Sequence, residues 1–307
     1  MHKVSIQSYP FYNHDKALES LEYIKARGFE AIDYNINTYL NGKDVLGSGV
    51  KPSIFDKTES ELIDFFKPLK EASEKTGVII TQMHATYPAW EQGKYEANDY
   101  IHMALDKTFA VCEYLNCPHI VVHPLDGATR QEEWERNLNL FEGLIPLIKK
   151  RNGVKICIEN IFGRRPGRTC EGRLSNALEA AKLIDYLNDK AGGDYFGFCF
   201  DVGHSMLSRR DIYQFLLDIG SRLSILHIHE NNGDEDLHCL PFTCVNTADH
   251  LICDWNGFIK GLKDINYKGD LSFETAQVLK RMPAPTHDKV YELICEMGKY
   301  FVSEIEK

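Results

Sequence analysis

The sequence predicts an α/β protein built as a single (β/α)8 barrel, and three observations support this prediction. Eight short apolar segments alternate with eight amphipathic segments along the chain, which is the pattern of βα units and a parallel sheet. The 307 residues divide into units of about 38 residues, which suits such a barrel with some long loops. No linker rich in Pro, Gly or Ser interrupts the series, so we expect one domain over residues 1–307.

Each predicted strand is a short apolar run, often rich in β-branched or aromatic residues, which are favoured on a pleated sheet. In chain order the eight runs are 4–9 (VSIQSY), 29–35 (FEAIDYN), 78–84 (VIITQMH), 119–123 (HIVVH), 154–159 (VKICIE), 196–201 (FGFCFD), 223–229 (LSILHIH) and 270–274 (DLSFE).

Each predicted helix carries its apolar residues along one side at a period near 3.6. In the segment 99–115, for example, Ile101, Leu105 and Cys112 lie on the same stripe. In chain order the eight segments are 16–27, 59–76, 99–115, 131–150, 174–189, 211–219, 255–265 and about 289–305.

Four connections that follow strands are longer than the others, namely 36–57, 85–98, 160–173 and 230–254. In a barrel these connections emerge at the end where active sites are built, so they predict a walled substrate pocket. We expect 163–168 to be a solvated loop, from which Arg165 could bind a substrate phosphate or carboxylate. In 85–98, Tyr87 and Trp90 could stack on a sugar ring or an aglycone, or could simply pack the loop on itself.

The composition excludes several classes of function. The chain has 35 Lys and Arg against 45 Asp and Glu, a formal net charge of −10, and no basic run, which argues against nucleic-acid binding. No segment approaches the roughly 18 apolar residues of a membrane span, and the N-terminus lacks the apolar stretch of a signal peptide. The nine cysteines contain no CxxC pair and suggest reduced thiols. We therefore expect a cytoplasmic protein without nucleic-acid or membrane partners.

Ionisable residues close six of the eight predicted strands: His84, His123, Glu159, Asp201, His229 and Glu274. Their separations of 39, 36, 42, 28 and 45 residues are near one βα repeat, so a closed barrel would bring them into one ring. Side-chain alternation supports this arrangement, since His227 and His229 share one face of their strand and Leu226 and Ile228 the other.

Four of these residues have the chemistry of a metal site. Glu159, Asp201, His229 and Glu274 converging on one point would hold a divalent cation, either Mn, Mg, Co or Zn. The alternative is that each is a separate hydrogen-bonded residue at a strand end. Six such residues at repeat spacing disfavour that alternative, because buried carboxylates without partners are costly.

Two motifs add further candidate residues. In the segment 200–205 (FDVGHS), three positions separate Asp201 from His204, so both can point into the mouth of the barrel. The segment 227–238 (HIHENNGDEDLH) places three histidines and several acids, including Asp236 and His238, around the end of one strand.

With these motifs, and with QMHATYP (82–88), VVHP (121–124), ICIEN (156–160) and LSFET (271–275), the chain resembles the xylose isomerase-like TIM barrel superfamily of sugar phosphate isomerases and epimerases. The resemblance implies one metal ion on Glu159, Asp201, His229 and Glu274, with His204 contacting the substrate. Ketose 3-epimerases of this superfamily have an arginine six residues after the ligand histidine. This chain has Glu235 there, so the resemblance does not extend to free-ketose specificity.

The same superfamily includes an endonuclease IV branch that binds three zinc ions, and its residue types are also present in this chain. The matching positions are His84, His123, Glu159, Asp201, His204, His229, Asp236, His238 and Glu274. Three adjacent metals would make a phosphodiesterase centre, but the acidic charge and the absence of a basic track argue against a DNA substrate. A metal-free binding protein on the same scaffold is a third class.

The favoured hypothesis is a metal-dependent sugar isomerase or epimerase. The metal would bind a carbonyl oxygen and an adjacent hydroxyl of a small carbohydrate and stabilise the enediolate, while Glu159 and Glu274 remove and return the proton. The substrate would contact His84, His123, His204, Asp236, His238, Trp90 and Arg165. Loss of a β-hydroxyl from the same intermediate would instead give a dehydratase or lyase. The resemblance also allows a homo-oligomer.

Overall fold

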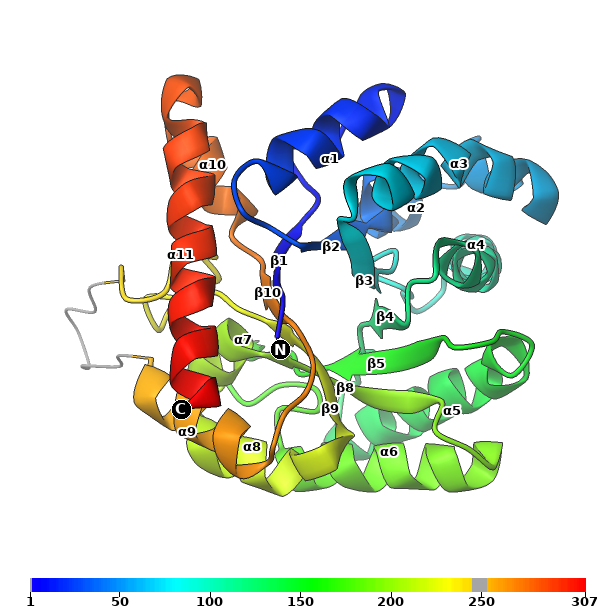
Figure 1. Cartoon of the computed structure of the whole chain (residues 1–307). Helices are drawn as coiled ribbons and strands as arrows, with labels where there is room; N and C mark the ends of the chain where they lie inside the picture. The colour runs from blue at the N-terminus through cyan, green and yellow to red at the C-terminus, as the bar shows by residue number, and fades with distance from the viewer. Residues whose placement is uncertain (1, 245–252) are drawn as a thin grey trace.

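The computed structural model describes residues 2–244 and 253–307, and eight parallel strands form a barrel surrounded by helices (Figure 1). The sheet runs in the order β10-β1-β2-β3-β4-β5-β8-β9. Its two edges meet at Ile228, whose N–H donates to Ser272 O at 2.8 Å and whose carbonyl accepts from Glu274 N at 3.1 Å. The predicted (β/α)8 fold is therefore confirmed.

All eight predicted strands form, with bounds that differ from the prediction by at most two residues at either end. The structure ends β4 at Val122, β9 at His227 and β10 at Phe273, so His123, His229 and Glu274 follow their strands rather than close them. The strands are β1 (Val4–Gln7), β2 (Ala31–Asn35), β3 (Ile79–His84), β4 (His119–Val122), β5 (Lys155–Glu159), β8 (Phe196–Asp201), β9 (Leu223–His227) and β10 (Leu271–Phe273).

Eight helices correspond to the predicted amphipathic segments, and polar side chains cap several of them. Thr58 and Glu61 form a capping box at the start of α3, and Asn176 accepts two backbone N–H groups at the start of α6. These helices are α1 (Ala17–Lys25), α3 (Glu59–Thr76), α4 (Tyr95–Leu115), α5 (Arg130–Ile148), α6 (Ala177–Ala191), α8 (Ile212–Ile219), α9 (Trp255–Asp264) and α11 (His287–Glu306).

The long connections contain structure that hydrophobic periodicity does not predict. The segment expected to be a solvated loop at 163–168 belongs to a hairpin of β6 (Gly163–Arg165) and β7 (Arg168–Cys170), with Gly167 at φ +77° in its turn. Three short helices also form, α2 (Gly42–Ser48), α7 (Val202–Leu207) and α10 (Ala276–Arg281). Single 3-10 turns lie at His14–Lys16, Ile36–Thr38, Ile54–Asp56, Gly220–Arg222 and Ala284–Thr286.

The predicted long connection 230–254 is described only in part, because residues 245–252 lie outside the described residues. In the described portion of the chain, no helix is both long and apolar enough to cross a membrane. All nine cysteines are described, and they form no disulfide.

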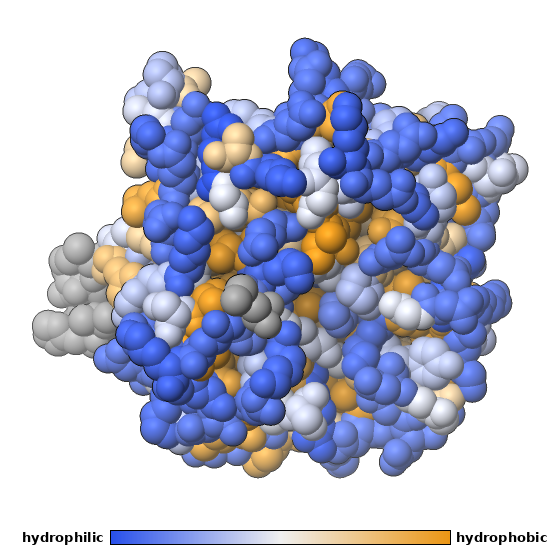
Figure 2. All heavy atoms as spheres, in the orientation of Figure 1, coloured by the Kyte–Doolittle hydropathy of each residue, from blue (hydrophilic) through white to orange (hydrophobic). Residues whose placement is uncertain are grey.

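The core has two layers because side chains alternate along each strand. Large side chains such as Phe109, Phe198 and Phe258 fill the space between strands and helices, where full burial of each contributes about 1.5–3 kcal/mol. Inside the barrel the apolar cluster is small and consists of Val121, Cys157, Cys199 and Ile225. Hydrophilic residues cover much of the outer surface in the view of Figure 2. Above the inner cluster, the inward side chains become polar.

Candidate active site

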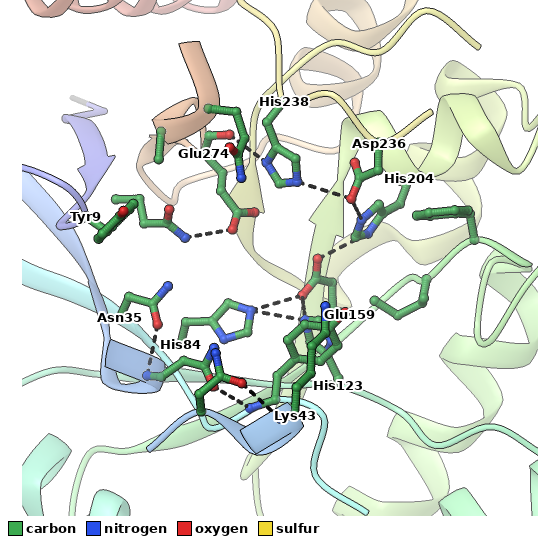
Figure 3. A pocket seen from close by; sticks show the side chains of 18 of the residues that line it. Tyr9, Asn35, Lys43, His84, His123, Glu159, His204, Asp236, His238 and Glu274 are labelled. Atoms are coloured by element: carbon green, nitrogen blue, oxygen red, sulfur yellow. Dashed lines mark hydrogen bonds and ion pairs between the residues drawn. The ribbon is translucent and has the colours of Figure 1, made fainter. Parts of the chain in front are cut away.

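A cavity of about 1180 Å³ opens at the carboxyl ends of the strands. Its base holds Gln7, His84, Glu159 and Glu274, and its rim is formed mainly by the long connections. Figure 3 shows side chains from separate strands pointing toward one another in this cavity. Of the predicted site residues, those lining the cavity are His84, His123, Glu159, His204, Asp236, His238 and Glu274.

Three carboxylates at the ends of three strands meet at the base of the cavity. One oxygen each of Glu159, Asp201 and Glu274 lies with a nitrogen of His227 in a group whose members are all within 4.8 Å of one another. His227 Nδ1 lies 3.3 Å from Glu159 Oε1 and 3.3 Å from Glu274 Oε2, so one imidazole bridges the two glutamates. The predicted convergence of the three carboxylates is therefore seen directly.

His229 lies beside this group and is fully buried. Its Nε2 is 2.9 Å from Asp201 Oδ2, its Nδ1 has no protein partner, and its ring stacks on His238 at 4.0 Å between centroids. A nitrogen of His229 also lies within 4.8 Å of Glu274. Gly203 makes room for the ring, because a Cβ there would lie 2.1 Å from the imidazole.

The donor set fits a divalent cation. Glu159 and Asp201 are at most 1% exposed, and Glu274 is 14% exposed, so their negative charge is concentrated where water screens it poorly. The nearest compensating groups in the described structure are imidazoles, whose nitrogens are themselves metal donors. Carboxylate oxygens combined with imidazole nitrogens suit Mn, Co or Zn, and a richer oxygen set suits Mg.

Two further histidines surround the other side of Glu159. His123 Nε2 lies 2.8 Å and His84 Nε2 3.8 Å from Glu159 Oε2. Burial would raise the pKa of Glu159, but His123 and His227 hold the pKa of that carboxyl well below its usual range. Glu159 therefore stays ionised at neutral pH and touches four imidazoles, since His204 Nδ1 is 3.3 Å from its Oε1.

The three-residue spacing of Asp201 and His204 reflects a helix N-cap. Asp201 is the N-cap of α7, and its Oδ1 accepts the His204 backbone N–H at 2.6 Å. The His204 ring then directs Nδ1 to Asn160 O at 2.9 Å and Nε2 to Asp236 Oδ2 at 3.5 Å. His238 Nε2 lies 3.2 Å from the same Asp236 oxygen. Asp236 thus joins two histidines that the sequence places 34 residues apart.

The Asp236–His238 pair predicts a pH-dependent stability of the chelator-treated protein. Burial lowers the pKa of His238, but Asp236 and Glu274 outweigh burial and raise it from 6.5 to about 9. The resulting stabilisation is complete below pH 6.5 and is lost as the pH rises through 9. Its size is up to about 3 kcal/mol. Urea unfolding of the wild type and His238→Gln should therefore differ most at pH 6.5 and least above pH 9. A difference that stays constant with pH would contradict this expectation.

Three inward-facing residues are not among the predicted site residues: Gln7, Asp33 and His227. Gln7 Nε2 donates to Glu274 Oε1 at 2.7 Å, and Asp33 Oδ2 lies 3.3 Å from His227 Nε2. All three are at most 5% exposed. Side-chain alternation is the signal for these positions, because it puts His227 on the same face as His229, as the sequence already indicates, and Gln7 pairs with Asp33 in the β1–β2 register.

Two predicted substrate residues lie away from the main cavity. Trp90 lines a smaller chamber beside it, and Arg165 is exposed on the β6–β7 hairpin. The neighbouring Arg164 lines the main cavity instead, with its guanidinium 5.1 Å from the Phe162 ring centre. Successive residues of the hairpin strand point to opposite faces, which is why only one of the two arginines reaches the cavity.

The sequence profile of one protein family, described as xylose isomerase-like TIM barrel, matches residues 21–291 of this chain. This chain belongs to the xylose isomerase-like TIM barrel family. Among curated relatives, the uncharacterized protein y4fM of Sinorhizobium fredii is 34% identical to this chain over 164 residues. The aligned region covers 52% of this chain and 48% of the relative. The chain thus aligns with about half the length of that relative.

Solved structures share the fold of this xylose isomerase-like protein. A D-psicose 3-epimerase determined in the presence of D-fructose superposes with a TM-score of 0.66 at 15% identity, covering 97% of this chain and 99% of the other. The 3-keto-D-glucoside 4-epimerase of E. coli gives 0.67 at 15% identity, covering 98% and 100%. An AP endonuclease of family 2 from Brucella melitensis gives 0.59 at 14% identity, covering 90% and 93%. At these identities the likeness shows the fold alone.

Proposed function

We propose that the protein is a metal-dependent sugar isomerase or epimerase that moves a proton next to a carbonyl group. The observation that carries the proposal is the pairing of two glutamates, Glu159 and Glu274, around one buried group of metal-type donors beneath a polar cavity. The similarity of fold to a D-psicose 3-epimerase and a 3-keto-D-glucoside 4-epimerase supports it.

The ligands of one divalent ion would be Glu159, Asp201, Glu274 and His229, with His227 below them. Bound there, the ion would draw electrons from a substrate carbonyl and make the neighbouring C–H more acidic. Glu159 would then exchange a proton with one face of that carbon, and Glu274 with the other. Gln7 orients Glu274 through its 2.7 Å hydrogen bond, and His123 and His204 orient Glu159.

The cavity has polar groups suited to sugar hydroxyls. His204 and His238 converge on Asp236 at one side, and Asn35 and Asn37 line the opposite side. The Oδ1 atom of Asn37 accepts the Tyr87 N–H at 3.1 Å, so its side chain is held in place. Fixed donors and acceptors of this kind select a polyhydroxylated substrate, because they are left unpaired when hydroxyls are missing.

A second candidate is a phosphodiester hydrolase with three metal ions. It is favoured by one observation, the clustering of nine candidate ligands into three adjoining sets. One set is His84, His123 and Glu159. In the middle, Glu159, Asp201 and Glu274 lie together, and His229 lies beside Asp201 and Glu274. The third set is His204, Asp236 and His238. The formal charge of −10 argues against a polyanionic substrate, so we rank this function second.

Elemental analysis of protein purified without chelator or added metal separates the two candidates. We expect about one equivalent of a divalent metal per chain. In D₂O that protein should introduce deuterium at the carbon next to a carbonyl when D-fructose, D-psicose or a 3-keto-D-glucoside is supplied, as followed by NMR. Chelation should abolish the exchange, and readdition of the metal should restore it.

Close to three equivalents of zinc, together with hydrolysis of an abasic-site DNA, would replace the proposal by the second candidate. A product that has lost one water would identify a lyase acting through the same proton abstraction. Metal-bound protein that exchanges no α hydrogen in any of these sugars would contradict the proposal.

A further inference from the structure

A side chamber of about 250 Å³ adjoins the main cavity. Its walls include Tyr87, Pro88, Trp90, Leu125 and Arg136. Both spaces share four lining residues, so the chamber lies directly beside the cavity that contains the glutamates. These shared residues are Tyr87, His123, Asp126 and Arg173.

The side chamber differs from the main cavity in chemistry. The main cavity is lined mostly by amides, imidazoles and charged groups, whereas Tyr87, Pro88, Trp90, Pro124 and Leu125 give the chamber an aromatic and apolar wall. Flat rings with an apolar face, whether aromatic or pyranose, gain contact energy on such a wall. Hydroxyl groups alone would gain little there.

The position of Trp90 is set by Arg136 of α5. The Arg136 guanidinium lies 4.8 Å from the Trp90 ring centre. The same guanidinium donates to Asp126 O at 2.7 Å and to Gln92 Oε1 at 3.0 Å. Its charge is further paired with Glu132, so Arg136 serves to hold the indole and is not free to bind an anion.

Buried hydrogen bonds hold the other walls. Asn137, only 1% exposed, accepts the Leu125 N–H at 2.7 Å and donates to Leu125 O at 2.9 Å. Gly42 N–H donates to Tyr87 O at 3.1 Å, and a Cβ on Gly42 would lie 2.1 Å from Pro88 O. The chamber is thus preformed, so a ligand would lose little free energy in ordering it.

Only the His123 side chain separates Tyr87, on the chamber wall, from the proposed proton-transfer group Glu159. The Tyr87 ring centre lies 4.3 Å from that of His123, and His123 Nε2 lies 2.8 Å from Glu159 Oε2. The chamber therefore lies within reach of a group joined to a sugar ring that is held at the glutamates. The main cavity alone already exceeds the roughly 300–1,000 Å³ of a pocket for a drug-sized ligand.

We propose that the side chamber is the subsite for a second ring, and that the substrate is a glycoside: a sugar joined through its glycosidic oxygen to another ring. The inference rests on the proposed function for the position of the reacting sugar, but the chamber itself can be tested by binding alone. Trp90 and Tyr87 contact the second ring, and Glu159 and Glu274 face the first.

Calorimetric titration of the purified protein with three β-D-glucopyranosides tests the subsite. The methyl glycoside supplies one ring, the phenyl glycoside adds an aromatic ring, and cellobiose adds a second sugar. We expect at least one two-ring glycoside to bind about tenfold more tightly than the methyl glycoside. Trp90→Ala should remove this preference and leave methyl-glycoside binding within about twofold of wild type. The ratio of phenyl glycoside to cellobiose affinity identifies the second ring.

Trp134→Ala is the matched control, because Trp134 lies on α5 and lines neither space. It should retain the wild-type preference. Equal or undetectable binding of all three glycosides, or equal weakening of all three by Trp90→Ala, would overturn the inference. If the wild-type protein prefers two-ring glycosides but exchanges no α hydrogen in the deuterium experiment, the proposed function would be contradicted and the subsite would still be supported.

Discussion

Glu159→Gln should abolish turnover of the substrate found in the deuterium screen, with a loss of about 10³-fold or more. Glutamine keeps the shape of the side chain but cannot accept the proton. In wild type this carboxylate is at most 1% exposed and lies within 3.8 Å of His84, His123, His204 and His227. Its loss also removes one of the proposed metal ligands, so bound metal should fall as well. Steady-state kinetics and elemental analysis of the same sample provide the two measurements.

Glu230→Gln is the matched control for that substitution. Glu230 is also 1% exposed and lies at the same end of the barrel, after β9. It accepts the backbone N–H groups of Thr243 and Cys244 and does not line the cavity. We expect this variant to keep wild-type turnover. Turnover of Glu159→Gln within about tenfold of wild type, with circular dichroism unchanged, would exclude Glu159 as a proton-transfer group.

Glu274→Gln should separate proton removal from proton return. If each glutamate serves one face of the carbon, this variant should slow the interconversion of the two epimers by about 10²–10⁴-fold. It should still exchange the α hydrogen of one epimer with solvent deuterium, because Glu159 remains. Gln7 can still donate to the amide oxygen of the new side chain, so the local fold should survive. NMR of each purified epimer in D₂O measures the exchange.

Exchange of both epimers by Glu274→Gln would mean that one base serves both faces, and the two-base assignment would then be wrong. Exchange of neither epimer, with metal still bound and the melting temperature unchanged, would mean that Glu274 is needed for the first proton removal. In that case Glu159 and Glu274 would not divide the two faces between them.

Much of this arrangement was predictable because it is encoded in local periodicity and repeat spacing. The apolar runs placed all eight strands, and the recurrence of ionisable residues near one βα repeat placed Glu159, Asp201 and Glu274 around one centre. A closed parallel barrel leaves little freedom at this level, since every strand must end at the same rim. The match to the xylose isomerase-like family agrees with this repeat pattern.

The remainder depends on contacts between residues far apart in the chain. Asn37 meets the Tyr87 backbone, and Arg136 meets Trp90, so Trp90 lies in the side chamber and not in the main cavity. The β6–β7 hairpin directs Arg164, and not Arg165, to the substrate space.

His227 illustrates how far the sequence alone can predict the site. Its inward direction follows from strand alternation. Its 3.3 Å separation from Glu274 depends on the closure of β9 against β10, and its 3.3 Å separation from Glu159 depends on the register of β5, β8 and β9. Periodicity along one segment specifies which face a side chain occupies. Which side chains then touch across the barrel is decided by strand register and by loop packing, and these are properties of the assembled tertiary structure.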